Sequence, residues 1–119
     1  MRTLTSLLIA VAGFALSGCD KPPAVQPIAT AAEMAAWPRT VEQAVTNIVA
    51  SMSAEDKQKV RATKKEDLIQ YHHGWGTGIR NDLGLWRGNR ELLADCKAQH
   101  PDDASMVIIE AVWERLRKP

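Results

Sequence analysis

Residues 102–116, Asp-Asp-Ala-Ser-Met-Val-Ile-Ile-Glu-Ala-Val-Trp-Glu-Arg-Leu, contain the clearest helical pattern in the sequence. Apolar residues recur there three and four positions apart, which places them on one face of an α-helix. Pro101 suits a first helical turn, and Asp102 and Asp103 complement the positive end of the helix dipole. We therefore predict a final helix that begins near Asp102. Its buried face would consist of Ala104, Val107, Ile108, Ala111, Val112 and Leu116.

Three earlier helix starts are marked by capping residues. Residues 40–43 and 63–66 fit the capping box, in which a hydroxyl and a side chain three residues later satisfy free backbone N–H groups. Residues 53–56, Ser-Ala-Glu-Asp, are a looser version of the same motif. Each motif predicts that a helix begins within one or two residues of its hydroxyl.

Apolar stripes extend these starts into helices. From Thr63 to Leu83, apolar residues recur at helical spacing and form one continuous stripe, which predicts a single helix. Gly84 suits the end of that helix. The members of this stripe are Leu68, Ile69, His72, Gly76, Ile79 and Leu83. A shorter helix is expected from Asn89 to about Ala98. Since alternating strand patterns are absent, we predict a small all-α domain of four to five helices.

The tryptophans and the second cysteine are the expected core markers. Trp86 and Trp113 are predicted to anchor the core, because a small domain needs large apolar side chains. Trp75 lies among glycines and is expected to be partly exposed. Cys96 follows Leu92 by four residues on one helical face, so we predict a buried thiol, with an intermolecular disulfide as the alternative.

The first 19 residues have the layout of an export signal. Arg2 precedes an apolar run from Leu4 to Leu16, which is too short for a membrane span of about 20 residues. The run ends in Leu16-Ser17-Gly18-Cys19, which resembles the lipobox of bacterial lipoproteins. The resemblance implies cleavage before Cys19, acylation of that cysteine and attachment to a membrane.

Asp20 bears on which membrane holds the protein. An aspartate after the lipidated cysteine resembles the enterobacterial signal that retains lipoproteins in the inner membrane. We therefore expect the periplasmic face of the inner membrane, with the outer membrane as the alternative. Residues 19–36, with Pro22, Pro23 and Pro27, are interpreted as a lipidated cysteine and a flexible tether. The expected organisation is thus a signal peptide at 1–18, a tether at 19–36 and a helical domain at 37–119.

The charge balance argues against nucleic acid as a partner. Removal of residues 1–18 takes away Arg2, one of 15 basic residues, and leaves 14 to balance the 14 acidic ones. A neutral chain offers no basic face for a phosphate backbone. No cofactor is indicated by the sequence.

Residues 71–82 are unusual because three glycines interrupt a helical pattern, at about 1 kcal/mol each relative to alanine. Gly74 and Gly78, four residues apart, favour close packing of another helix against this one. A phosphate-binding loop is the weaker interpretation, because the Lys-Ser/Thr of a P-loop is missing and no strand precedes the segment.

The same region resembles a family known as a domain of unknown function, found in short bacterial proteins. The motifs that carry the resemblance are His72-x-Gly74-x-Gly76, Ile79-Arg80-Asn81, Gly84-Leu85-Trp86 with Gly88, and residues 100–105, His-Pro-Asp-Asp-Ala-Ser. The resemblance covers Pro38 to about Leu116. The chain differs from the family pattern at His73 and Gly78, where bulkier apolar residues are usual. The resemblance implies a helical domain and brings no established activity.

The polar residues of these motifs form the candidate site: His72, Arg80, Asn81, His100, Asp102, Asp103 and Ser105. Histidines and aspartates can bind a metal or transfer protons. The structural interpretation fits better, with His72 as a hydrogen-bonded core histidine and Asp102, Asp103 and Ser105 as helix caps. His72 and His73 point about 100° apart on a helix and cannot face one metal ion together.

Anchoring without a recognisable catalytic constellation favours a lipid-anchored interaction module that binds a protein partner or envelope component. One alternative is a small metal-dependent or hydrolytic enzyme that uses His72, His100, Asp102 and Asp103. An accessory or immunity-type protein is a third hypothesis.

Overall fold

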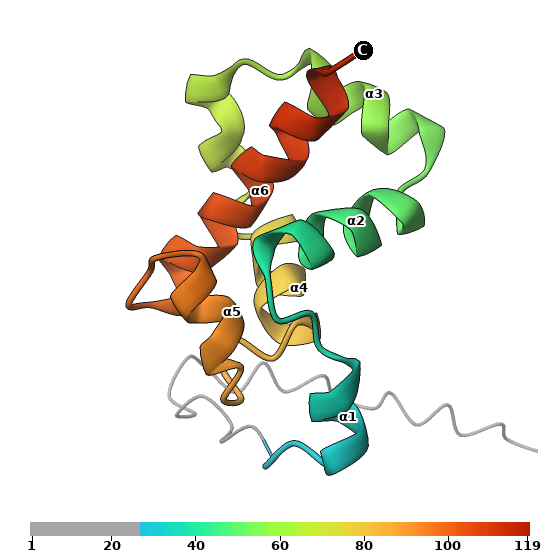
Figure 1. Ribbon diagram of the computed structural model, residues 1–119. Coiled ribbons are helices and arrows are strands. Elements are labelled where there is room, and N and C mark those ends of the chain that lie inside the picture. The colour runs from blue at the N-terminus through green and yellow to red at the C-terminus, as the bar shows by residue number, and fades with distance from the viewer. Residues whose placement is uncertain (1–26) are drawn as a thin grey trace, which may run out of the picture.

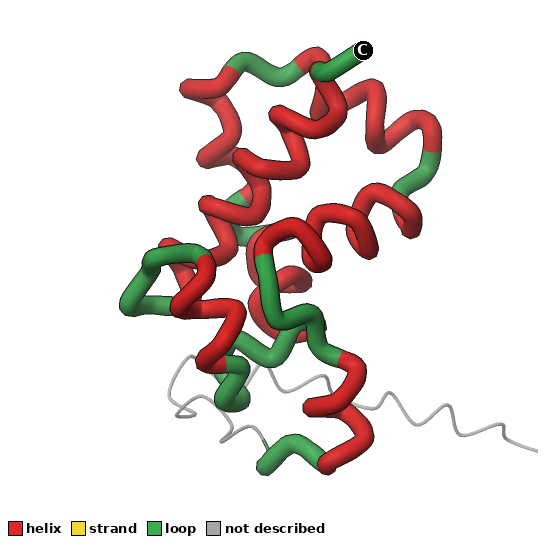
Figure 2. The backbone as a smooth tube through the Cα atoms, in the orientation of Figure 1, coloured by secondary structure: helices red, strands yellow, loops and turns green. Residues whose placement is uncertain are grey.

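The computed structural model describes residues 27–119, and every regular element in that range is a helix (Figures 1 and 2). The elements are α1 (Ala31–Ala36), α2 (Val41–Ser51), α3 (Ala54–Ala62), the 3₁₀ helix η1 (Lys65–Tyr71), α4 (Trp75–Asp82), α5 (Arg90–Asp95) and α6 (Pro101–Arg117). The predicted all-α class is confirmed. The expected signal peptide and Cys19 lie outside the described residues. Within residues 27–119, no helix combines the length and the apolar character needed to cross a bilayer.

Helix α6 is the axis of the fold, and α2, α3, α4 and η1 all pack against it (Figure 1). It begins one residue before the predicted Asp102. Its buried face differs from the expected one, since Val107 is 39% exposed whereas Ile109 is fully buried. Four of the six predicted residues, Ala104, Ile108, Val112 and Leu116, are buried as expected. The face also includes the polar residue Ser105, which the apolar pattern could not identify and which is buried and hydrogen-bonded.

Two of the three predicted capping motifs are confirmed. The hydroxyls of Thr40 and Ser53 accept the backbone N–H of the residue three positions later, at the starts of α2 and α3. The prediction for Thr63 is confirmed only in part: η1 begins two residues later, at Lys65, but Thr63 does not cap it, because Thr63 is the C-cap of α3. Its hydroxyl bonds instead to the Lys59 carbonyl and to the Tyr71 hydroxyl.

The predicted continuous helix after Thr63 is two separate elements. The 3₁₀ helix η1 stops at Tyr71, and α4 starts only at Trp75 after a turn through His72 to Gly74. Gly74 has backbone angles of φ −87° and ψ −84°, outside the helical region. The stripe therefore predicted the buried residues Leu68 and Ile79 correctly but not the break between them.

Gly84 ends α4 as predicted, and two features make glycine necessary there. Its φ is +69°, and a Cβ atom at this position would overlap the Trp37 ring. The buried side chain of Asn89 ties the same corner together. Its amide donates to the Pro38 and Leu83 carbonyls, and its oxygen caps α5 by accepting the Leu92 N–H.

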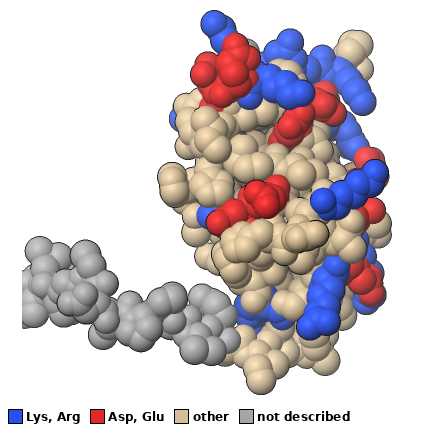
Figure 3. Space-filling model, turned by 90° about the vertical axis from the view of Figure 1, so that its left-hand side faces the viewer, with Lys and Arg blue, Asp and Glu red and all other residues tan. Residues whose placement is uncertain are grey.

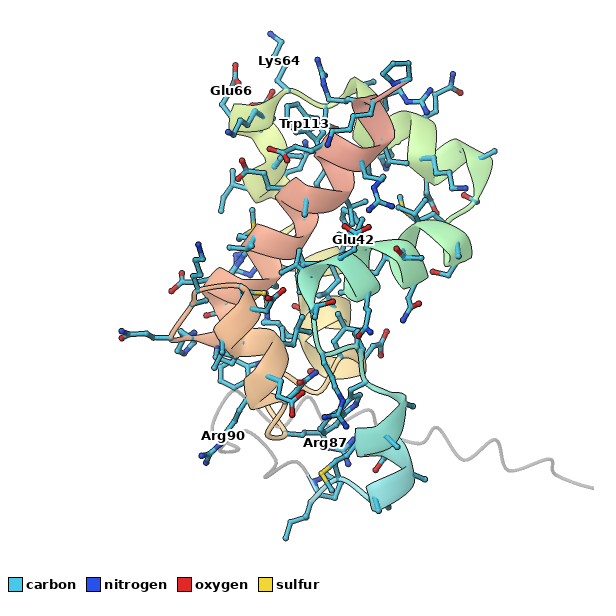
Figure 4. The ribbon with its side chains drawn as sticks, in the orientation of Figure 1. Glu42, Lys64, Glu66, Arg87, Arg90 and Trp113 are labelled. Atoms are coloured by element: carbon cyan, nitrogen blue, oxygen red, sulfur yellow. The ribbon has the colours of Figure 1, made fainter. Side chains whose placement is uncertain are left out.

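Residues 27–36 are not the extended linker that the sequence analysis expected. Thr30 and Glu33 form a complete capping box that starts α1, and Ala29 is buried. The Arg87 guanidinium bonds to both oxygens of Glu33 and to the Pro27 carbonyl, and Figure 4 shows Arg87 beside α1. These hydrogen bonds hold the pKa of Glu33 at about 2. Thr30 and Glu33 match the capping box in the sequence, but the alanines and prolines around them are typical of a tether.

The core markers agree with the predictions except at Trp86. Cys96 is buried, and Trp75 is half-buried, as expected. Trp113, labelled on α6 in Figure 4, is also half-buried. It donates its Nε1–H to the Thr63 carbonyl and has Arg117 over its ring. Trp86 is 48% exposed, so its assignment to the core is wrong; its ring meets His100 edge to face at 5.2 Å.

We expect Gly84→Ala to destabilise the protein by at least about 2 kcal/mol, because left-handed backbone is unfavourable for alanine and the methyl group overlaps Trp37. The matched control is Gly78→Ala in α4. A Cβ atom at Gly78 meets nothing within 4 Å, so the higher helix propensity of alanine should raise the free energy of unfolding of this variant by up to about 1 kcal/mol. Urea denaturation measures both changes, and equal effects at the two glycines would contradict the geometry.

Cys96 should react slowly with thiol reagents in the folded protein. Burial, and to a smaller extent the Asp95 carboxylate, raises the thiol pKa from 9.0 to about 11, which lowers the thiolate fraction about 100-fold. In a Cys19→Ser variant, where Cys96 is the single thiol, labelling at pH 8 should accelerate sharply on unfolding. Rapid labelling of the native state would refute the burial.

The same shift sets a pH dependence of stability. Folding favours the protonated thiol, so its contribution is complete below about pH 9 and is lost as pH rises through about 11. A Cys96→Ala variant should lack this decline when urea denaturation is compared at pH 8 and pH 11. An identical decline in both proteins would assign it to other groups.

Candidate functional site

Arg80, on α4, is the centre of the polar motif residues and is only 6% exposed. Its Nη1 donates to Ser105 Oγ at 2.8 Å, and its Nη2 donates to Thr77 Oγ1 at 2.9 Å. Its Nε lies 3.3 Å from Asp102 Oδ1. Ser105 in turn donates to the Asp102 carbonyl. We call Arg80, Thr77, Asp102 and Ser105 the Arg80 cluster; it joins α4 to the first turn of α6.

Gly76 owes its identity to this cluster. A Cβ atom there would lie 3.0 Å from Arg80 Nη1 and 3.2 Å from the Tyr71 carbonyl oxygen. Any side chain would therefore displace the guanidinium from its partners. Of the three glycines in residues 71–82, Gly76 thus makes room for a buried arginine.

His100 is the N-cap of α6, a role that the sequence analysis gave to its neighbours. Its Nδ1 accepts the Asp102 N–H at 3.2 Å and lies 3.6 Å from Asp102 Oδ2. Asp102 bonds to Arg80 instead of capping the helix, and Asp103 is exposed. Ser105 is fully buried in the Arg80 cluster.

The remaining candidates lie elsewhere. His72 is half-buried at the end of η1 with its ring 5.0 Å from that of His73, and its buried Nδ1 has no hydrogen-bond partner among the described residues. The expected hydrogen-bonded core histidine is thus not what the structure has. Asn81 is exposed and lines a hollow beside Trp37. The structure therefore gathers Arg80, His100, Asp102 and Ser105 but not His72, Asn81 or Asp103.

The chemistry of the Arg80 cluster is that of a structural link. The carboxylate of Asp102 faces a permanent cation, and both Ser105 and the guanidinium are buried with their hydrogen bonds used. Within residues 27–119, no group of three or more His, Cys, Asp or Glu is arranged to hold a metal ion. The cluster fixes two helices relative to each other.

A concave surface lies between α2 and α4, and we call it the α2–α4 groove. It is a hollow of about 420 Å³, to which α3 contributes Asp56. Its wall residues are Asn47, Ile48, Ser51, Met52, Asp56, Trp75, Gly78, Ile79, Asp82 and Leu83. Sequence reasoning missed it, although Trp75, Gly78 and Asp82 lie on one face of α4 at spacings of three and four.

The prediction that Gly74 and Gly78 admit a neighbouring helix is wrong. No atom lies within 4 Å of a Cβ built on either residue. Gly78 opens onto the α2–α4 groove instead. Its lack of a side chain widens that groove and relieves no contact within the described fold.

The chain belongs to the family described as Domain of unknown function (DUF6794), which it matches over residues 37–116. No curated protein and no solved structure matches it. The matched range includes α2 to α6, and so both the Arg80 cluster and the α2–α4 groove. It begins after α1.

Asp102→Ala should destabilise the protein by about 1.5–3 kcal/mol, because it removes a charged partner from the buried Arg80 guanidinium. Asp103→Ala is the matched control: Asp103 occupies the same first turn, is exposed and forms no ion pair with a described residue. Its loss should cost less than about 1 kcal/mol, the contribution of the helix dipole. Thermal and urea denaturation give the difference, and equal losses would show that the pairing with Arg80 contributes nothing.

Proposed function

We propose that this chain is a lipid-anchored protein of the bacterial cell envelope whose helical domain binds a protein partner. The observation that carries the binding role is the α2–α4 groove, a recess that the Trp75 ring shares with apolar and acidic side chains. Aromatic side chains beside open apolar surface are characteristic of protein recognition sites.

The location rests on the sequence of residues 1–19. An apolar run that ends in Leu16-Ser17-Gly18-Cys19 directs export and places lipid on Cys19. Asp20 favours the periplasmic face of the inner membrane, with the outer membrane as the alternative. Several acyl chains on one cysteine hold a protein permanently at a bilayer, since each buried methylene contributes about 0.8 kcal/mol.

The described surface suits contact with a protein. On the face seen in Figure 3, acidic and basic side chains alternate and uncharged residues fill much of the centre. The balanced charge of the chain after residue 18 favours neither nucleic acid nor an anionic lipid surface as the principal partner. Binding of a partner would therefore depend on shape and local side-chain chemistry and not on net charge. The α2–α4 groove supplies both.

Cys19→Ser tests the anchor. The wild-type protein should sediment with membranes, resist extraction by high salt and dissolve in detergent, because acyl chains and not charges hold it. The variant should appear in the soluble fraction or keep its signal segment. Mass spectrometry of the wild-type protein should find a diacylated or triacylated Cys19 as the first residue; an intact Met1 with a free thiol at position 19 would overturn the anchoring.

Crosslinking of intact membranes tests the binding role. Full-length protein carrying an affinity tag after Pro119 should return the same partner protein in replicate experiments. A partner of this kind contacts the groove, so a Met52→Glu variant should lose it while Ile69→Glu, on the exposed surface of η1, keeps it. Recovery of no reproducible partner would count against the proposal.

A further inference from the structure

The α2–α4 groove is the middle of a longer channel on the surface. At one end it shares Asn47, Asp82 and Leu83 with a hollow of about 370 Å³ beside Trp37. At the other end it shares Met52, Asp56 and Trp75 with a hollow of about 240 Å³ beside Tyr71. An elongated depression of this form accommodates a segment of polypeptide better than a small rounded ligand.

Helix α4 supplies one continuous wall. Trp75, Gly78 and Asp82 occur at intervals of three and four residues, so they share a face about 10 Å long. The ring of Tyr71 contacts Trp75 edge to face with 5.6 Å between centroids. This contact orients the indole while leaving it half-buried at the junction of two hollows.

Gly78 provides close access in the middle of that wall. A glycine inside a helix reduces stability relative to alanine, and nothing within the described fold requires it here. The missing side chain lets another backbone approach the helix closely. The stability lost by having glycine at position 78 can therefore be offset by the binding of another chain, but not by packing within the described fold.

The α2–α4 groove carries negative charge, which favours a partner segment with basic side chains. Asp56 and Asp82 lie at its two ends, and no lysine or arginine lines it. Neither carboxylate forms an ion pair with a described residue, in contrast to Asp102 and Glu33. The adjoining hollows each have one cation, Lys59 beside Tyr71 and Arg87 beside Trp37, and Arg87 is paired with Glu33. Carboxylates and the face of an indole both attract cationic side chains.

We propose that the α2–α4 groove binds a segment of a partner protein that carries lysine or arginine, with the backbone of the segment laid over Gly78. The proposal deepens the binding role above and rests on it, but it does not depend on the lipid anchor. One basic side chain of the segment contacts Trp75 and Asp56, and a second contacts Asp82.

A random dodecapeptide library selected on the full-length chain tests this chemistry. The selected peptides should be enriched in lysine or arginine together with an apolar residue. Their affinity should fall about threefold with Asp56→Asn or Asp82→Asn and about tenfold with both. Asp103→Asn, which removes an exposed carboxylate outside the groove, should leave affinity unchanged.

Gly78→Leu tests the place of binding. It fills the centre of the groove and should reduce peptide affinity at least about tenfold while its thermal denaturation remains cooperative. Should that variant fail to fold, the double Asn variant, which alters only two unpaired carboxylates, decides the outcome. Selection of acidic or neutral peptides, of no peptide, or of peptides indifferent to both variants would overturn the proposal.

The two proposals fail in different ways. If membrane crosslinking returns a partner that Gly78→Leu still binds, the chain is an interaction module that uses another surface, and the groove proposal alone is wrong. If basic peptides bind the groove but crosslinking returns only lipid or a second copy of this chain, the groove proposal stands and the binding of an envelope protein partner is wrong.

Discussion

The buried guanidinium of Arg80 is the constraint on which the arrangement of the helices depends. A charge in this position must be surrounded by acceptors, and all three lie within α4 or the first turn of α6. Satisfying them fixes α4 against the axis of the fold. Because α2 packs on the same axis, the separation of α2 and α4 is also fixed, and the groove between them is a rigid consequence of an ion pair on the opposite side of α4.

Most of the fold follows from patterns that the sequence displays openly. Hydroxyl caps at Thr40 and Ser53, the glycine after α4 and the apolar periodicity of α6 each correspond to one local interaction. The errors share a cause, which is that tertiary contacts reassign a residue. Thr63 closes one helix because Tyr71 is within reach of its hydroxyl, and Ser105 joins the buried face because Arg80 bonds to it. Neither partner is adjacent in sequence.

The candidate site could be predicted only in part. The motif residues around positions 80 and 100–105 do converge, and the bonds among Arg80, Asp102 and Ser105 join α4 to α6. The groove draws on three elements whose individual residues look unremarkable, since an isoleucine, a methionine or an aspartate at a helix surface has many roles. Only the relative placement of α2, α3 and α4 shows that Gly78 opens into space. The two faces of α4 therefore differ: one carries the Arg80 cluster, and the other lines the α2–α4 groove.

Because Arg87 bonds to α1, the segment between the proposed lipid anchor and the folded domain is shorter than residues 19–36. Eighteen residues, from the proposed acylation site Cys19 to Ala36, precede the domain that begins at Trp37, enough for about 60 Å of extended chain. Ten of them, Pro27 to Ala36, are committed to the folded body through Glu33 and the Pro27 carbonyl. The eight that remain span at most about 30 Å. A domain anchored in this way would stay in a thin layer next to the bilayer. It could contact short loops of neighbouring membrane proteins but not a partner on the far side of a wide periplasm.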